Sequence, residues 1–98
     1  MSESPDTALS SLHAVVHGRV QGVNFRYYTQ LQAAQLGLTG WVCNQWDGTV
    51  ETTAEGPLPA LRAFEQFLKR GPSTARVERV DVTYGEASGS FGGFSIRY

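Results

Sequence analysis

The hydrophobic and polar positions divide the chain into β-favouring runs and two stretches with helical spacing. A β-permissive run predicts a first strand at about residues 12–18. Two more β-rich runs, 39–44 and 49–54, flank Asp47-Gly48, a dipeptide that favours a tight turn because both residues tolerate positive φ. These two runs predict a β-hairpin with Asn44 near its tip.

The C-terminal third of the chain predicts two further strands. Apolar residues from Val77 to Tyr84 indicate a strand of roughly ten residues, and the change of parity between 77 and 80 indicates a β-bulge or a later start of the strand. Phe94, Ile96 and Tyr98 alternate with polar residues and predict a final half-buried strand. The sequence does not reveal which strand this last one pairs with.

Helical spacing of apolar residues occurs twice. From Asn24 onward it predicts an amphipathic helix that Gly37 can end as a left-handed cap. A second helix is predicted to start at Pro57–Pro59 and to stop at Gly71-Pro72. The predicted apolar face of the first helix is Tyr27, Tyr28, Leu31, Ala34 and Leu38, and that of the second is Leu61, Phe64, Phe67 and Leu68.

The resulting order of elements is β-α-β-β-α-β with an extra C-terminal strand. Right-handed crossovers in the two βαβ-like halves give an α+β, ferredoxin-like split βαβ sandwich, with both helices on one face of an antiparallel or mixed sheet. The core strands are expected in the order 4-1-3-2. We expect residues 12–98 to form a single domain and residues 1–11, which are Ser-rich with few apolar anchors, to be a disordered tail.

Composition narrows the function further. The formal net charge of −1 offers no global field that would attract nucleic acid. No run of 18 apolar residues could span a membrane and no secretory signal is visible, so a cytoplasmic protein is expected. Cys43 is the only cysteine, which excludes an intrachain disulfide and a structural zinc site and favours a buried, inert thiol. A monomer is the default for this size.

The stretch Gly18-Arg19-Val20-Gln21-Gly22-Val23-Asn24-Phe25-Arg26 carries the candidate chemistry. Two glycines four residues apart permit a tight loop whose backbone N–H groups converge. Asn24 can cap the helix that follows, and Arg26 falls in the first turn of that helix. Converging amides, a helix N-terminus and a guanidinium group together predict a seat for a phosphoryl group or another tetrahedral oxyanion.

The loop lacks the residues of the common phosphate-handling enzymes. The Lys-Ser/Thr pair of a Walker A loop and the third glycine of a dinucleotide fingerprint are missing, and no nucleophile lies between Val20 and Arg26. Any reaction therefore needs attack by water, for which Asn44 is the best orienting group, although a carboxamide cannot act as a general base. A carboxylate leaves without assistance at neutral pH, so the site suits a mixed carboxylic-phosphoric anhydride.

At these residues the sequence resembles the acylphosphatase family. Besides the loop, the matching elements are Leu36-Gly37-Leu38-Thr39-Gly40-Trp41-Val42-Cys43-Asn44 and Asp47-Gly48-Thr49-Val50-Glu51. The resemblance implies a small enzyme without metal or other cofactor that hydrolyses acyl phosphates to a carboxylate and inorganic phosphate. It implies that Arg26 binds the phosphoryl oxygens and Asn44 orients the water. The loop amides that would assist Arg26 belong to Val20, Gln21, Gly22, Val23, Asn24 and Phe25.

Two other functions remain open at this point. Ferredoxin-like sheets also occur in RNA-recognition domains, but no basic, aromatic-rich strand motif is visible in the chain. A non-catalytic regulatory, ligand-binding or carbamoyl-phosphate-handling domain is the stronger alternative. Several remaining side chains are expected to be structural: His13 and His17 as exposed or satisfied residues, Trp41 and Trp46 in core and turn packing, and Tyr27 and Tyr28 in helix packing.

Overall fold

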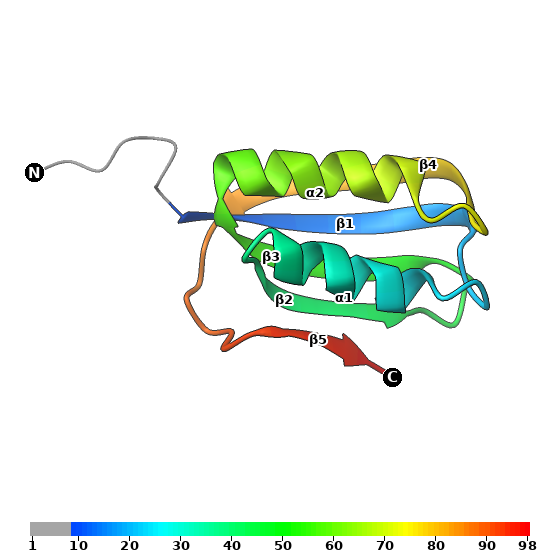
Figure 1. Cartoon of the computed structure of the whole chain (residues 1–98), viewed down its shortest axis with the longest axis horizontal. Coiled ribbons are helices and arrows are strands. Elements are labelled where there is room, and N and C mark those ends of the chain that lie inside the picture. The colour runs from blue at the N-terminus through cyan, green and yellow to red at the C-terminus, as the bar shows by residue number, and fades with distance from the viewer. Residues whose placement is uncertain (1–8) are drawn as a thin grey trace, which may run out of the picture.

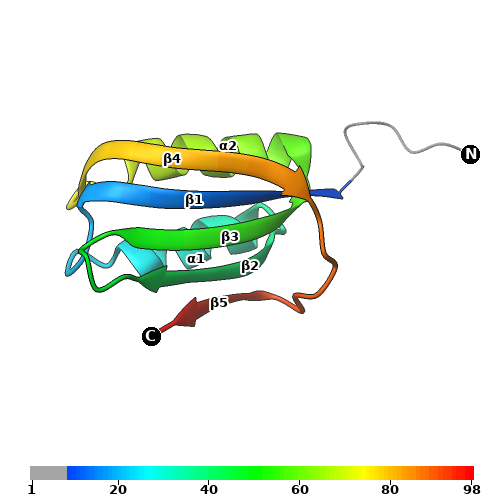
Figure 2. The ribbon, with the colours of Figure 1, turned by 180° about the vertical axis from the view of Figure 1, so that it is seen from behind.

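A computed structural model describes residues 9–98 of the protein as one five-stranded sheet covered on one face by two helices (Figure 1). The strands lie in the order β4-β1-β3-β2-β5, and the opposite face of the sheet is open (Figure 2). The ferredoxin-like α+β prediction and the 4-1-3-2 core order are therefore confirmed. The elements are β1 (Leu9–Arg19), α1 (Phe25–Gln35), β2 (Thr39–Asn44), β3 (Val50–Pro57), α2 (Leu58–Arg70), β4 (Arg76–Glu86) and β5 (Phe94–Arg97).

Strand β1 begins earlier than the sequence pattern predicts. Its first residue is Leu9, which pairs with Pro57 at the end of β3. Residues 9–11 are thus part of the sheet, and the predicted disordered tail is wrong for them, because backbone pairing along β3 orders this segment without apolar anchors. Residues 1–8 of the predicted tail lie outside the described residues.

The predicted bulge in β4 is confirmed. In the antiparallel pairing of β1 with β4, His17 pairs with Arg79 but the next residue, Gly18, pairs with Val77, which leaves one extra residue in β4. Gly18 has φ 130°, and a Cβ atom there would lie 2.2 Å from the backbone oxygen of Arg76. Only glycine fits this position, which lies one residue before the end of β1 and the start of the loop.

Strand β5 pairs in parallel with the outer edge of β2. The carboxylate of Glu55 fixes the connection from β4 by accepting hydrogen bonds from the backbone N–H groups of Ser88 and Gly89 and from the Ser88 hydroxyl. Phe94 and Ile96 are half-buried as predicted, but Tyr98 is 97% exposed. Tyr98 follows the last residue of β5, so the half-buried alternation ends at Ile96.

The helical predictions differ in outcome. In α2 the predicted stripe of Leu61, Phe64, Phe67 and Leu68 is buried as expected. In α1 the predicted apolar face is wrong except for Leu38, which follows the helix. The sheet is contacted instead by residues spaced four apart, which lie on one side of a helix: the buried residues are Phe25, Thr29 and Ala33, and the exposed ones include Tyr27, Tyr28, Leu31 and Ala34.

Candidate active site

Three segments meet at one end of the sheet, where Figure 1 shows the loop before α1, the turn between β2 and β3, and the end of β5. They surround a cavity of about 320 Å³. The structure therefore brings Arg26 and Asn44 to one cavity, although one lies in the first turn of α1 and the other at the end of β2. The lining residues are Val20, Gly22, Asn24, Phe25, Arg26, Tyr27, Asn44, Ile96 and Tyr98.

The backbone of the 20–24 loop adopts left-handed conformations at Gly22 (φ 74°) and Asn24 (φ 61°). Asn24 occupies the N-cap position of α1, but its side chain makes no capping hydrogen bond, so the capping prediction is wrong. A capping side chain needs an extended backbone, which Asn24 does not have. Within residues 9–98, no acceptor receives the backbone N–H groups of residues 21–25. These amides are free to bind an anion.

Apolar side chains at both ends of the loop hold it against the core. Val20 and Phe25 are buried, and Val23 is packed against the same core cluster. The hydroxyl of Thr74, in the segment before β4, donates a hydrogen bond to the backbone oxygen of Val23 at 3.0 Å. Because these side chains point into the protein, the loop offers a ligand its main chain and the exposed side chain of Asn24, which lines the cavity.

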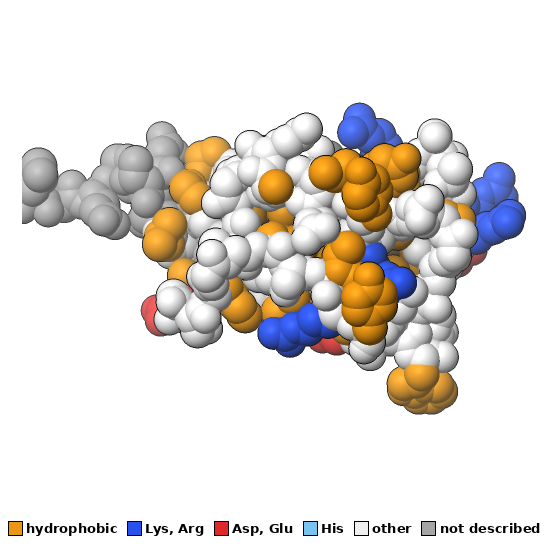
Figure 3. Space-filling view, turned by 60° about the horizontal axis from the view of Figure 1, so that its bottom comes forward, with side chains coloured by type: hydrophobic (Ala, Val, Ile, Leu, Met, Phe, Trp, Pro, Cys, Tyr) orange, Lys and Arg blue, Asp and Glu red, His pale blue; other side chains and the backbone are white. Residues whose placement is uncertain are grey.

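Arg26 is the positively charged residue of the cavity. One of its guanidinium nitrogens, Nη1, donates to the backbone oxygen of Arg97 at 3.4 Å, and Cζ lies 4.7 Å from the centre of the Tyr98 ring. Figure 3 shows hydrophobic side chains beside Lys and Arg side chains on this side of the molecule. No carboxylate of the described residues pairs with Arg26. A cation in the first turn opposes the helix dipole, and a bound anion would relieve that repulsion.

Asn44 is the last residue of β2, and it pairs with Val50 across the hairpin. Asn44 lines the cavity, and its carboxamide has no hydrogen-bond partner in the part of the chain that the structure describes. The turn beyond it is tightly bonded, since Asp47 Oδ1 accepts hydrogen bonds from both the backbone and the hydroxyl of Thr49. These bonds hold the pKa of Asp47 below its usual value. A rigid turn therefore presents a free carboxamide.

Gln21 and Val23 do not line the cavity, although both belong to the predicted binding loop. The Gln21 carboxamide points to the hairpin turn, where it donates to the backbone oxygens of Gln45 and Thr49. Cys43, next to Asn44, is partly buried, and its pKa is raised by burial and by the Glu51 carboxylate. Both effects disfavour the thiolate, in line with an inert thiol.

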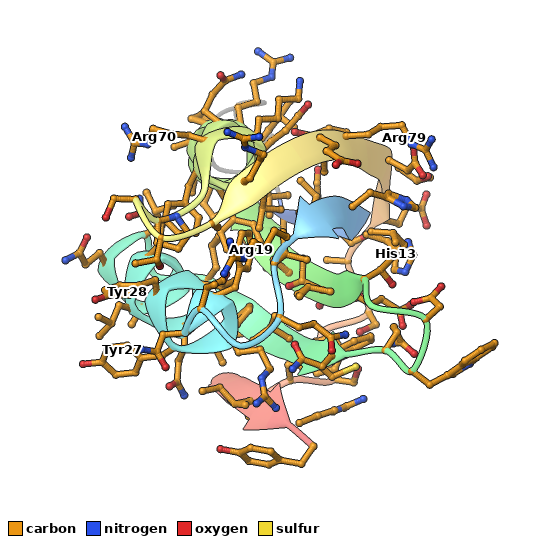
Figure 4. The ribbon with its side chains drawn as sticks, turned by 90° about the vertical axis from the view of Figure 1, so that its right-hand side faces the viewer. His13, Arg19, Tyr27, Tyr28, Arg70 and Arg79 are labelled. Carbon is orange, nitrogen blue, oxygen red and sulfur yellow. The ribbon has the colours of Figure 1, made fainter. Side chains whose placement is uncertain are left out.

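The histidines lie away from the cavity. His13 and His17 both belong to β1. His13 Nε2 lies 2.6 Å from the Glu51 carboxylate, and His17 Nε2 lies 2.9 Å from the Asp81 carboxylate. Figure 4 places His13 and Arg79 on the open side of the sheet, opposite Tyr27 and Tyr28 on α1. Both histidines are satisfied by carboxylates, as predicted. Residues 9–98 contain no group of three or more His, Cys, Asp or Glu arranged to hold a metal ion.

The predicted packing of Trp46 and of the tyrosine pair on α1 is wrong, and that of Trp41 holds in part. Trp46 is 96% exposed at the tip of the turn, because a tight two-strand hairpin leaves its outermost side chain without neighbours. Trp41 is half-buried, and Cζ of the Arg97 guanidinium lies 4.7 Å from the centre of its ring. Tyr27 and Tyr28 pack against each other, with ring centres 5.3 Å apart, on the exposed side of α1. Among the described residues, no helix has the length and apolar character needed to cross a membrane.

Comparisons with known proteins agree with this geometry. The acylphosphatase family model matches residues 12–96. An acylphosphatase of Thermus thermophilus is 53% identical over 78 residues, covering 80% of this chain and 89% of the relative. One of Salinibacter ruber is 49% identical over 84 residues, covering 86% and 88%. The crystal structure of acylphosphatase from Bacillus subtilis superimposes with a TM-score of 0.87 at 42% identity, covering 91% of this chain and 99% of that one.

The family model therefore covers nearly the whole described structure and every cavity-lining residue except Tyr98, and in each comparison both chains are matched over most of their length. The likeness is one of sequence and of fold at the same time. The chain belongs to the acylphosphatase family of enzymes.

Proposed function

We propose that this enzyme hydrolyses acyl phosphates to a carboxylate and inorganic phosphate at the cavity between the 20–24 loop and the β2–β3 turn. One observation carries the proposal: Arg26, which no carboxylate of the described residues neutralises, and the unbonded loop amides share this cavity with the free carboxamide of Asn44. The cavity lining contains no Cys, Ser, Asp or His that could attack phosphorus. The lining also holds the phenols of Tyr27 and Tyr98 but no His, Asp or Glu that could activate them, so water is the nucleophile.

The phosphoryl group is bound by positive charge and by main-chain donors. Its oxygens accept hydrogen bonds from the backbone N–H groups between Val20 and Phe25, and the planar guanidinium of Arg26 supplies two parallel donors. Catalysis is then mainly electrostatic and positional, because fixed donors stabilise the charge that develops on the phosphoryl oxygens in the transition state.

Asn44 orients the attacking water. Its carboxamide oxygen accepts one hydrogen bond from the water, while its nitrogen can donate to a phosphoryl oxygen. As the bond from water to phosphorus forms, the bond from phosphorus to the acyl oxygen breaks and the carboxylate leaves with the electron pair. A phosphoryl oxygen takes up the proton of the water, so no side chain has to act as a base. The leaving group needs no proton, since its parent acid has a pKa of about 4.

The test is hydrolysis of acetyl phosphate by the full chain in the presence of EDTA. We expect turnover that survives chelation and that inorganic phosphate inhibits competitively. Arg26→Ala and Asn44→Ala should each lower kcat/KM by about 100-fold to 1,000-fold, which is the usual cost of removing a hydrogen-bond donor to a developing anion. Turnover that both variants retain would refute the site, and turnover lost on chelation would refute the metal-free mechanism.

Arg26→Lys separates positive charge from geometry. An ammonium group keeps the charge but loses the planar pair of donors, so we expect little recovery over Arg26→Ala. Arg70→Ala is the matched control, because Arg70, the last residue of α2, does not line the cavity. It should leave kcat/KM within about twofold of the native value. Phosphate binding without any turnover in the native chain would favour the non-catalytic alternative.

A further inference from the structure

We propose that Gln21 is a positioning residue that keeps the phosphate-binding loop in register with the turn that carries Asn44; this inference rests on the proposed function. Gln21 lies in the middle of the 20–24 loop, and its half-buried side chain points away from the cavity. Nε2 donates one hydrogen bond to the backbone oxygen of Gln45 at 2.6 Å and another to that of Thr49 at 2.8 Å. Both hydrogens of its amide group are thereby used.

The two acceptors belong to the two ends of the hairpin turn. The backbone N–H of Gln45 donates to the oxygen of Thr49 at 2.8 Å, so the Gln21 amide attaches to the closed base of the turn, directly after Asn44. Within residues 9–98, no other hydrogen bond joins the 20–24 loop to this turn. The relative position of the two halves of the site therefore depends on one side chain, in addition to their packing on the core.

The turn to which Gln21 attaches is itself fixed to the sheet. The side-chain nitrogen of Gln45 donates to the Glu51 carboxylate and lies 3.2 Å from Cys43 Sγ. The other oxygen of Glu51 lies 2.6 Å from His13 Nε2 on the neighbouring strand β1. This continuous set of contacts extends from the open face of the sheet to the phosphate-binding loop. Gln21 is the member that reaches the loop.

The consequence for the reaction concerns geometry more than binding. In-line attack requires the water held by Asn44 and the phosphorus held by the loop to be about 3–3.5 Å apart, and a misplacement of about 1 Å can lower the rate about 100-fold. Phosphate affinity depends on Arg26 and the loop amides, which Gln21 does not replace. Loss of the Gln21 hydrogen bonds should therefore reduce kcat much more than it reduces affinity for phosphate.

The chemistry of the two acceptors also explains why an amide stands at this position. Two carbonyl oxygens need two N–H donors, and a carboxylate in their place would repel both. A protonated carboxyl group could donate to one of them. Gln21→Glu should thus recover part of the lost activity as the pH falls. Because Asp47, Glu51 and His13 lie in or beside the turn, its activity is compared with that of the native chain at each pH.

The experiment compares the native full chain with Gln21→Met, Gln21→Glu and the control Gln30→Ala. Met keeps the length and the apolar stem of Gln but donates no hydrogen bond. Gln30 on α1 makes the same kind of bond, from Nε2 to the backbone oxygen of Phe94 at 3.1 Å, but outside the cavity lining. For each protein we would measure kcat and KM with acetyl phosphate, the inhibition constant of inorganic phosphate, and the midpoint of urea unfolding.

We expect Gln21→Met to lower kcat by tenfold to 100-fold while the phosphate inhibition constant changes less than about threefold, and Gln30→Ala to leave both nearly unchanged. An unchanged kcat, or an equal loss of kcat and phosphate affinity, would overturn the inference. If Gln21→Met does not fold, the Glu variant decides: activity relative to the native chain must rise toward low pH. A native chain that does not turn over acetyl phosphate would refute the proposed function instead.

Discussion

Helices α1 and α2 cover the same face of the sheet, but they are built for different tasks (Figure 1). In α2, four large apolar residues point into the core: Leu61, Phe64, Phe67 and Leu68. In α1, the buried residues Thr29 and Ala33 are small, and the only large one is Phe25 at its first position. The greater part of the apolar contact between helices and sheet thus comes from α2, whereas α1 carries the start of the candidate site.

The ends of the two helices show the same difference. In α2, proline occupies the start and Lys69 and Arg70 occupy the last turn, where cations favour the helix dipole. Neither helix start has a side-chain cap, but α1 has no proline there either, and Arg26 in its first turn opposes the dipole. The position of Arg26 lowers the stability of α1 by about 0.3–1 kcal/mol. The unbonded N–H groups and the positive charge at this start are available to an anion, so the weaker helix start is the one that we propose as the phosphate site.

The largest effect that separates the two helices is expected for Phe64→Ala in α2. Phe64 is fully buried and packs edge-to-face on Phe94, with ring centres 5.9 Å apart. Its truncation should lower the free energy of unfolding by about 3–5 kcal/mol, measured by urea denaturation. Below the unfolding transition, kcat and KM should stay close to the native values. A change in kcat with full folding would show that α2 also shapes the site.

The second-largest effect on the free energy of unfolding is expected for Thr29→Val, on the side of α1 that faces the core. Thr29 is buried, and its hydroxyl has no hydrogen-bond partner within residues 9–98. Thr29→Val keeps the shape and removes the unsatisfied group, so it should raise the free energy of unfolding by about 1–2 kcal/mol. Calorimetry or urea denaturation would measure this. Destabilisation would mean that the hydroxyl has a partner, such as a buried water, and that the core face of α1 is satisfied after all.

The contrast between the helices also explains how much of the fold the sequence predicts. Where one face is strongly apolar, as in α2, periodicity identifies the element and its buried side together. In α1 the more apolar side is the exposed one, so periodicity predicts the helix but selects the wrong face. Contacts with the sheet set that face, and they depend on where Phe25 and Leu38 enter the core. These are tertiary facts that a local pattern does not contain.

The candidate site divides in a similar way. Motif and residue chemistry indicate Arg26, Asn44 and the loop, because anion binding requires particular residue types at short spacing. The pairing of β5 with β2 could not be predicted, since four residues of strand fit more than one edge. The left-handed backbone of Asn24 was also missed, because Asn suits both an N-cap and a positive φ. The two hydrogen bonds of Gln21 span the hairpin and are visible only in three dimensions.

A third prediction concerns pH, because α2 is linked to β4 by a titratable pair. The Tyr84 hydroxyl donates to Glu65 Oε1, and Lys69 Nζ lies 2.9 Å from Glu65 Oε2. Burial and the bond to Glu65 raise the pKa of Tyr84 to about 12. The hydrogen bonds from Tyr84 and Lys69 lower the pKa of Glu65. Helix α1 contains no acidic residue and has no such link.

The sign of the effect follows from the two shifts. A raised folded-state pKa of Tyr84 stabilises the protein below pH 10, and this contribution is lost as the pH rises toward 12. A lowered pKa of Glu65 stabilises above its ordinary value of 4.5, and this contribution is lost as the pH falls below it. Because Tyr84 is partly exposed, we expect each contribution to be about 1 kcal/mol after screening. In the Tyr84→Phe variant, the free energy of unfolding should depend less on pH both above pH 10 and below pH 4.5, as measured by urea denaturation at each pH. An unchanged pH profile would contradict the link between α2 and β4.

The smallest effect is expected for Leu31→Gln in α1, with Leu61→Gln in α2 as its matched control. Leu and Gln have similar helix propensities, so the two substitutions differ mainly in burial: Leu31 is 42% exposed and Leu61 is 0% exposed. In urea denaturation, Leu31→Gln should change the free energy of unfolding by no more than about 0.5 kcal/mol, whereas Leu61→Gln should lower it by several kcal/mol. A large loss at Leu31 would mean that the outer side of α1 is covered, and the division of tasks between the helices would fail. A small loss leaves Leu31 free to vary, because this side chain neither packs in the core nor lines the cavity.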